Sequence, residues 1–406
     1  ERARAAQNAR YSDDVGFDVL YLVRAARSQL AEEATLADPT TASFAAELTS
    51  DHAIALPGAD EGNWLPTTIE EPLQTLIDLS QRGLRLEMLA LDSADRLIRV
   101  SAEAGQLTVQ REQATFSLKR LHEWSIRFPF EYGLDTQDPN LFYTSMREIG
   151  LSQGVGDKAV FILDTSLQRL PPQLLLIDGQ LLGTTAASAV APSLTWLKAA
   201  VAAANKPYGP PAAWISTAVE GQGNGTLATV ADRVGDVLAQ HGVALHTGEQ
   251  VPANLSKAEL AIVAAHGGLA DDNRFFKVIS DEAQLRMNAL GLARTLEGAG
   301  VVILFVCSGG RQDEHPVAST TVGLPKQLLD RGSAAVIASP WPLDSRVPSH
   351  WLPAFLAAWQ AGQTLIDAHA AGNRAVSAQM GNEPRDALAM TLYGNAFLRR
   401  ADLMAH

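Results

Sequence analysis

Residues 301–310 have the sequence VVILFVCSGG, which is the strongest indication of the fold of this chain. The six apolar residues Val301–Val306 end in a Ser-Gly-Gly turn, a pattern that predicts a buried parallel strand. Active sites of open α/β sheets lie outside the carboxyl ends of such strands. Cys307, the only cysteine of the chain, follows this strand and therefore lies where the nucleophile of an active site at this sheet edge would be expected.

A second apolar run starts at Leu260 and delivers His266 into a Gly267-Gly268 turn. We expect His266 and Cys307 each to be the last residue of its strand, so that imidazole and thiol meet at one sheet edge. A lone cysteine or histidine in an apolar segment is more often a core residue, and this alternative stays open. The shared pattern favours a Cys/His pair, because such partners meet in space rather than in sequence.

Length and composition bound the class of protein. A chain of 406 residues with 47 % hydrophobic residues predicts one large or two ordinary domains. No apolar run approaches the ~18 residues of a membrane span and no signal peptide opens the chain, so we expect a cytoplasmic protein without a membrane partner. A single cysteine excludes an intramolecular disulfide and thiolate-rich metal sites, and no cofactor or metal is expected. Because the chain begins at Glu1 rather than methionine, we expect preceding sequence to have been removed.

The charge is concentrated in the first part of the chain. Residues 1–150 hold 14 Lys+Arg against 24 Asp+Glu, a balance of −10, whereas residues 151–406 hold 18 against 21, a balance of −3. No basic stripe with aromatic residues appears, so direct nucleic-acid binding is not expected. The acidic part could meet a basic partner, although a solvated acidic surface explains it equally well.

The pattern of elements predicts two domains with a boundary near residue 150. Residues 1–150 should form a smaller helical domain with an antiparallel meander over Leu84–Val109. Its expected helices are Val15–Glu33, Thr41–Ile54, Pro72–Arg82 and Phe116–Phe128.

Residues 151–406 alternate strand and helix, which predicts an α/β fold with a mostly parallel sheet covered on both faces. Its expected strands are Ala159–Leu163, Ala213–Thr217, Leu260–Ala264, Val301–Val306, Ala334–Ser339 and, late in the chain, Ala396–Leu398. Its expected helices are Thr226–Gln240, Asn288–Glu297, Leu324–Arg331 and Trp351–Gln360.

Five stretches between residues 155 and 400 carry motifs in a distinctive order. They are Phe161–Leu175, Leu182–Leu197, Ala265–Gly267, Cys307–Gly310 and Gly332–Asp344. Together they resemble the CHAT family, the caspase-like domains of the clan that contains separases, caspases and gingipains. The resemblance implies a caspase-like fold for residues 151–406 and a cysteine endopeptidase that cleaves a partner protein, in a bacterial regulatory or defence pathway. It also implies a Cys307/His266 dyad, with the backbone N–H groups of Gly267 and Cys307 stabilising the oxyanion.

The resemblance places the substrate pocket in the loops after the cysteine strand and the next strand. Asp313, Glu314 or Asp344 could select a basic residue before the scissile bond (P1), although loop carboxylates are usually just solvated. Trp341 is either a pocket wall or a packing residue. The 1–150 domain is expected to be either a pseudo-caspase-like domain or a regulatory region that binds a partner and holds the site closed.

Other interpretations are weaker. A catalytically silent caspase-like scaffold remains the alternative function. An α/β-hydrolase elbow needs glycine two residues before the nucleophile, where this chain has Phe305. The loop 221–225 lacks the residue spacing of a nucleotide-binding loop. His241 and His246 have no acidic or cysteine residues at metal-ligand spacing, so we expect these two histidines to be structural or exposed.

Overall fold

The computed structural model describes residues 13–57, 65–112, 150–203, 206–217, 225–269, 276–279, 285–314, 321–381 and 383–404. The chain forms two compact units. Unit 1 comprises residues 1–203 and 313–322, and unit 2 comprises residues 204–312 and 323–406.

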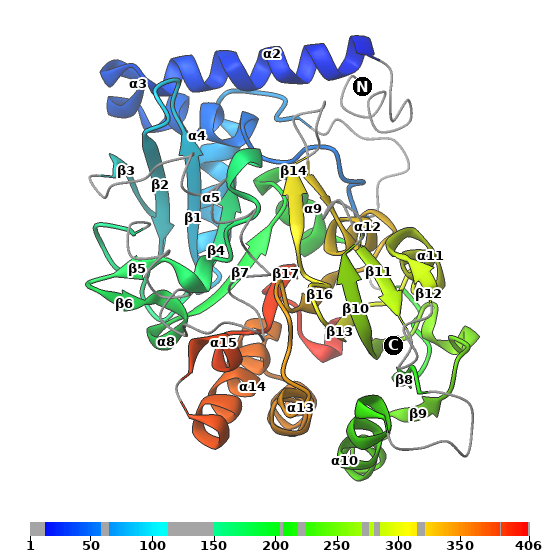
Figure 1. Cartoon of the computed structure of the whole chain (residues 1–406). Helices are drawn as coiled ribbons and strands as arrows, with labels where there is room; N and C mark the ends of the chain where they lie inside the picture. Colours follow the sequence, from blue (N-terminus) through cyan, green and yellow to red (C-terminus); the bar gives the residue numbers. More distant parts are fainter. Residues whose placement is uncertain are drawn as a thin grey trace. The chain divides into compact units, whose positions relative to one another are not determined.

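Unit 1 is built on five strands in the order β7-β4-β1-β2-β3 (Figure 1). Strands β1, β4 and β7 are parallel, whereas β1, β2 and β3 form the predicted antiparallel meander. The apolar run of β4 is buried along its length, as expected for an inner parallel strand. The bounds are β1 (Arg85–Leu91), β2 (Leu97–Glu103), β3 (Gln106–Arg111), β4 (Lys158–Leu163) and β7 (Ala187–Ala191).

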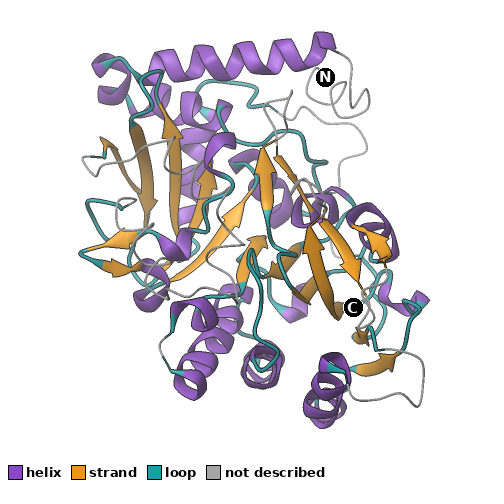
Figure 2. Ribbon diagram, in the orientation of Figure 1, coloured by secondary structure: helices purple, strands orange, loops and turns teal. Residues whose placement is uncertain are grey.

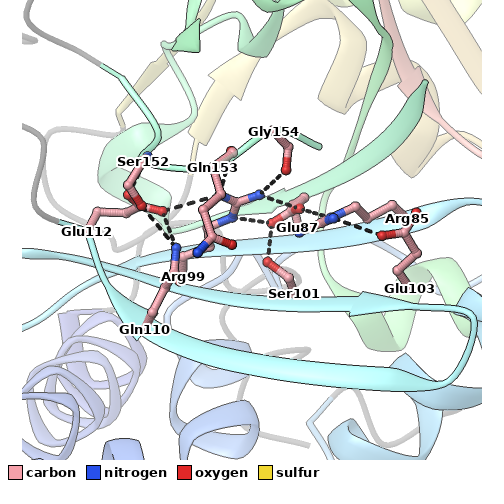
Figure 3. Close-up of polar contacts among 10 residues, drawn as sticks. All are labelled: Arg85, Glu87, Arg99, Ser101, Glu103, Gln110, Glu112, Ser152, Gln153 and Gly154. Atoms are coloured by element: carbon pink, nitrogen blue, oxygen red, sulfur yellow. Dashed lines mark hydrogen bonds and ion pairs between the residues drawn. The ribbon is translucent and has the colours of Figure 1, made fainter. Parts of the chain in front are cut away.

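The two sides of residue 150 share this sheet, which the predicted domain boundary did not anticipate. Strand β1 pairs with β4 from Arg85↔Ala159 to Leu89↔Leu163. The buried Arg99 guanidinium also donates hydrogen bonds to the carbonyl oxygens of Gln153 and Gly154 (Figure 3). The meander is therefore an integral part of the sheet that contains β4.

Helices α4 and α5 pack against the meander of unit 1, α4 against β1, β2 and β3 and α5 against β1 and β2. Further contacts with the sheet come from α2 against β1, α3 against β3, and α8 and α9 against β7. Helix α4 begins at Pro39, after the Asp38 cap, and ends at Leu48 rather than at the predicted Ile54. It stops there because the hydroxyls of Thr49 and Ser50 hydrogen-bond back to the carbonyls of Ala46 and Glu47. The predicted helix Phe116–Phe128 lies outside the described residues. The bounds are α2 (Asp13–Leu30), α3 (Glu33–Ala37), α4 (Pro39–Leu48), α5 (Glu71–Ser80), α8 (Leu182–Thr185) and α9 (Leu194–Ala202), with a small hairpin of β5 (Leu176–Ile177) and β6 (Gln180–Leu181).

Unit 2 has the order β9-β8-β10-β13-β16-β17, in which only β17 runs antiparallel to its neighbour. A hairpin of β11 and β12 extends the carboxyl-terminal half of β10. The mixed, mostly parallel α/β class is confirmed. The bounds are β8 (Ala212–Ile215), β9 (Ala244–Thr247), β10 (Leu260–Leu269), β11 (Phe276–Ile279), β12 (Leu285–Asn288), β13 (Val301–Val306), β16 (Ala335–Ala338) and β17 (Thr391–Gly394). A separate two-stranded pair of β14 (Gln312–Glu314) and β15 (Thr321–Gly323) belongs mostly to the 313–322 segment of unit 1.

The helices of unit 2 cover both faces of its sheet. Helix α10 contacts α13, which packs along α14, while α11 contacts α12 (Figure 2). Helix α10 connects β8 to β9, whereas α11 and α12 connect β10 to β13 and β13 to β16, in the opposite direction across the sheet. Because crossovers between parallel strands are right-handed, α10 lies on one face of the sheet and α11 and α12 lie on the other. The bounds are α10 (Thr226–Gln240), α11 (Ala289–Thr295), α12 (Leu324–Asp330), α13 (Val347–Gln360), α14 (Leu365–Met380) and α15 (Pro384–Ala387), close to the predicted helices except that α13 starts earlier and α14 was not expected.

The predicted late strand Ala396–Leu398 is wrong, because the last strand is β17. The carbonyl oxygens of Ala396 and Leu398 accept hydrogen bonds from the N–H groups of Ile366 and Leu365 at the start of α14. This apolar segment therefore accepts hydrogen bonds from the first N–H groups of a helix, and these carbonyl groups are not available for pairing in a sheet.

Candidate active site

The structure brings His266 and Cys307 side by side. Strands β10 and β13 are paired in parallel up to Ala265↔Val306, and these two residues follow directly. Neighbouring strands of a sheet lie about 4.8 Å apart. The backbones of His266 and Cys307 therefore occupy neighbouring positions at the carboxyl end of this strand pair.

His266 is not the last residue of its strand, contrary to the expectation. Strand β10 continues to Leu269, and His266 pairs with Ile279 of β11 in antiparallel fashion. Strand β10 pairs with β8 up to Ala264 and with β11 from His266 onward, so its partner on this side changes at this point. A Gly-Gly pair tolerates this extension because glycine is compatible with a strand as well as with a turn.

The histidine also marks the topological switch point of the sheet. From β8 the chain moves outward to β9, and it then returns to β10 and proceeds the other way to β13 and β16. In open α/β sheets, ligands bind outside the carboxyl ends of the strands at such a point. The site therefore occupies the place that the topology favours for a ligand.

Gly267 lets the two strands approach at the site. A Cβ atom on Gly267 would lie 2.1 Å from the carbonyl oxygen of Cys307 and 2.7 Å from Cγ1 of Val306. No side chain fits at this position without separating β10 from β13. The glycine after the histidine is thus required by the backbone contact with the cysteine.

The Cys307 thiol is only partly exposed and is held by a backbone amide. The N–H of Leu343 donates a hydrogen bond to Sγ at 3.3 Å. Burial raises the pKa of the Cys307 thiol above its ordinary value, whereas the backbone N–H groups of Leu343, Gly267 and Cys307 itself act in the opposite direction. Because burial dominates, the sulfur rests as a thiol at neutral pH.

Aromatic residues of α13 support the strand that carries the cysteine. Phe305, two residues before Cys307, makes an edge contact with Trp351, with ring centroids 5.8 Å apart. Trp351 stacks on Phe355 and donates its indole N–H to Asn373 at 2.8 Å. Sequence reasoning missed this support, although the spacing of these two aromatic residues on one helix face was the available signal.

The predicted pocket residues occupy different environments. Trp341 is 0 % exposed and donates its indole N–H to the carbonyl of Arg385, which favours packing over a pocket wall. Asp344 receives two side-chain hydrogen bonds from Arg346, and these hold the pKa of its carboxyl below the ordinary value. Asp313 and Glu314 lie in β14, five or more residues after the cysteine.

The remaining histidines singled out in the sequence pair with amides. His241 Nδ1 lies 2.6 Å from Oε1 of Gln360, and His246 Nε2 lies 3.0 Å from Nδ2 of Asn254. Within the described residues, no group of three or more His, Cys, Asp or Glu side chains could hold a metal ion. Of the helices that the structure describes, none is suited to crossing a bilayer.

The fold is that of the caspase-like cysteine peptidases. The chain belongs to the CHAT domain family, which it matches over residues 115–389. Among solved structures it is similar to the separase of the Saccharomyces cerevisiae separase–securin complex, with a TM-score of 0.52 at 10 % identity. That match covers 82 % of this chain and 32 % of the separase chain, so the present chain spans about a third of it.

Two further structures of this class share less of the geometry. The complex of the pro- and mature domains of RgpB from Porphyromonas gingivalis gives a TM-score of 0.44 at 13 % identity, covering 82 % of this chain and 78 % of that one. Caspase-1 from Spodoptera frugiperda gives a TM-score of 0.29 at 14 % identity, and the match covers 48 % of this chain and 89 % of the caspase chain. No curated protein matches the chain significantly.

Proposed function

We propose that this protein is a cysteine endopeptidase in which Cys307 is the nucleophile and His266 is the general base. The observation that carries the proposal is the register of β10 and β13, which sets the two residues on adjacent backbone positions at the switch point of the sheet. An imidazole that reaches the thiol from this backbone position can take up its proton, which nucleophilic catalysis by cysteine requires.

The resting thiol indicates general-base catalysis rather than a preformed ion pair. His266 would take the thiol proton as Sγ attacks the scissile carbonyl, so that the S–C bond forms and the carbonyl π electrons move to oxygen. The imidazolium then gives the proton to the leaving amine as the C–N bond breaks. Water, deprotonated by His266, cleaves the thioester and releases the acid, and the proton returns to the sulfur.

The backbone N–H groups of Gly267 and Cys307 are suited to stabilise the oxyanion. Both N–H groups act to lower the pKa of the Cys307 thiol, which supports a role for them next to the sulfur. Donors fixed in position before the reaction cost no reorganisation when charge develops on oxygen.

The substrate that we propose is a specific partner protein, in a bacterial regulatory or defence pathway and in a cytoplasm that keeps the single thiol reduced. This part of the proposal rests on the family resemblance and on the securin-bound state of the yeast separase structure. For P1 selection, Asp313, Glu314 and Asp344 remain the acidic candidates. Arg346 already binds Asp344, so this carboxylate selects a basic residue only if that ion pair opens.

Residues 1–150 are proposed to regulate access to the site and to bind a partner. A fragment starting near residue 150 is a poor test, because it would remove β1 from its pairing with β4 and Arg99 from its hydrogen bonds to Gln153 and Gly154. The full chain should instead be assayed with and without candidate basic partner proteins. A partner that changes the cleavage rate supports the regulatory role, and rates unchanged by every bound partner contradict it.

The test of the peptidase compares the full chain with Cys307→Ser, His266→Ala and the matched control His241→Ala on a proteome-derived peptide library. We expect cleavage by the parent chain and by His241→Ala, and none by the other two variants, with thermal unfolding unchanged. The cleavage pattern also identifies the P1 residue. Cleavage that survives in Cys307→Ser would remove the assignment, and the absence of both cleavage and thiol labelling in the parent chain would favour the silent scaffold.

A further inference from the structure

The turn that follows the nucleophile strand is strained. Ser308 has φ +59°, a left-handed conformation that is unfavourable for a non-glycine residue, and its side chain is buried. The N–H of Gly309 donates to the carbonyl of Val306, and that of Arg311 to the carbonyl of Ser308. Such a conformation persists only where the surrounding structure holds it, so the neighbours of this turn determine where Cys307 lies.

One side of the turn is fixed by the segment after β16. The N–H of Ser308 donates to the carbonyl of Trp341 at 3.1 Å, and the N–H of Gly310 donates to the carbonyl of Ser339 at 2.8 Å. A Cβ atom on Gly310 would lie 2.8 Å from the carbonyl oxygen of Ala338. The turn therefore lies directly against the segment that presents the Leu343 amide to Sγ.

Tyr393 holds the turn from another strand. Its phenol donates a hydrogen bond to the carbonyl oxygen of Gly310 at 2.7 Å, and the residue is only 5 % exposed. Tyr393 lies on β17, where it pairs with Val336 of β16. Burial raises the pKa of the Tyr393 phenol well above its ordinary value, so the phenol keeps its proton and remains a donor.

We propose that Tyr393 is a positioning residue for Cys307. Its phenol holds the Gly310 carbonyl, and this keeps the strained turn in the conformation that places Sγ within hydrogen-bonding distance of the Leu343 N–H. Without the phenol the turn relaxes and the sulfur loses its amide donor. The consequence for peptide cleavage rests on the proposed function, but the consequence for the thiol can be measured without any substrate.

The experiment measures the rate at which iodoacetamide alkylates the full chain between pH 7 and 12, a range that extends above the raised pKa of the thiol. Cys307 is the only cysteine, so the reaction reports on this sulfur alone. We expect Tyr393→Phe to raise the pH of half-maximal rate by about one unit, which lowers the thiolate fraction at neutral pH about tenfold. The matched control is Tyr208→Phe, which removes the hydroxyl of another half-buried tyrosine of unit 2 and should leave the profile unchanged.

A merely structural role of the phenol would lower the melting temperature without moving the alkylation profile measured well below it. A Tyr393→Phe profile that superimposes on those of the parent chain and Tyr208→Phe overturns the proposal. Should Tyr393→Phe not fold, Thr391→Val removes the side-chain hydroxyl that hydrogen-bonds the phenol. The same upward shift is then expected, and an unmoved profile overturns the proposal.

This result is separable from the peptidase test. A shifted profile in a chain that cleaves no peptide supports the positioning role and contradicts the proposed function. Cleavage by the parent chain together with unshifted variants supports the proposed function and contradicts the positioning role.

Discussion

Arg99 binds Glu87 through two parallel hydrogen bonds inside unit 1. Arg99 Nε and Nη2 lie 2.7 and 2.8 Å from the two carboxylate oxygens of Glu87, and both side chains are buried (Figure 3). Arg99 Nη1 also contacts Glu112 at 3.3 Å. Since Arg99 reaches Gln153 and Gly154 as well, this cluster joins the meander to the chain that leads into β4.

Replacing Arg99 with methionine should destabilise the protein by about 3 kcal/mol, because the buried Glu112 carboxylate loses its cation and the buried Glu87 carboxylate keeps only its ion pair with Arg85. The measurement is urea unfolding of the full chain. The matched control is Lys198→Met, which removes the more exposed ion pair with Glu71 and should cost no more than about 1 kcal/mol. Equal losses of unfolding free energy in the two variants would show that the buried cluster contributes no more to stability than the exposed ion pair does.

Gly267→Ala should abolish peptide cleavage and slow alkylation of Cys307. The new methyl group would overlap the Cys307 carbonyl oxygen, so β10 and β13 must separate at the site. The control is Gly235→Ala in α10, where the nearest atom would be Leu245 Cδ2 at 3.8 Å and where alanine favours the helix by about 1 kcal/mol. Full cleavage by Gly267→Ala would contradict the close approach of the two strands.

His369 should make stability depend on pH below neutrality. Burial lowers the pKa of His369 from its ordinary value of 6.5 to about 4, so the unfolded chain takes up this proton before the folded one does. Its contribution is present above pH 6.5 and is lost as the pH falls from there toward 4, by up to about 1.4 kcal/mol per pH unit. The slope of unfolding free energy against pH should therefore be smaller in His369→Gln.

The control for His369 is His241→Gln, because His241 is only half-buried and its ring hydrogen-bonds an amide side chain among its described contacts. This variant should keep the slope of the parent chain. The interpretation fails if His369→Gln and the parent chain lose stability in parallel between pH 6.5 and 4.

Opening the ion pair at Asp344 should change P1 preference. Arg346→Gln removes the guanidinium that now binds the carboxylate, which leaves Asp344 available to a basic P1 side chain. We expect kcat/KM for peptides with arginine at P1 to rise about tenfold relative to leucine at P1, the size of a typical partly exposed charge pair. The double variant Asp344→Asn/Arg346→Gln should lose this gain, and an unchanged ratio in Arg346→Gln would exclude Asp344 from the P1 pocket.

Local patterns in the sequence were sufficient to predict many of the strands and helices of unit 2. The apolar run Val301–Val306 is the strand β13, and Thr226–Gln240 is the helix α10, with the expected stop at His241-Gly242. Such elements follow from residue periodicity and from their terminating residues, which act over a few neighbouring positions. The apolar segment Ala396–Leu398 has the composition of a strand but not the location of one, because its carbonyl groups are used by a distant helix.

The position of a thiol and an imidazole after apolar strands of an α/β sheet could be predicted from the sequence, because apolar runs and glycine pairs are local features. The folded structure was needed to learn that Ala265 pairs with Val306, that Arg346 binds Asp344 and that Tyr393 hydrogen-bonds the Gly310 carbonyl. The physical reason is that register, ion pairs and buried hydrogen bonds join residues far apart along the chain. Their geometry exists only after the strands have packed.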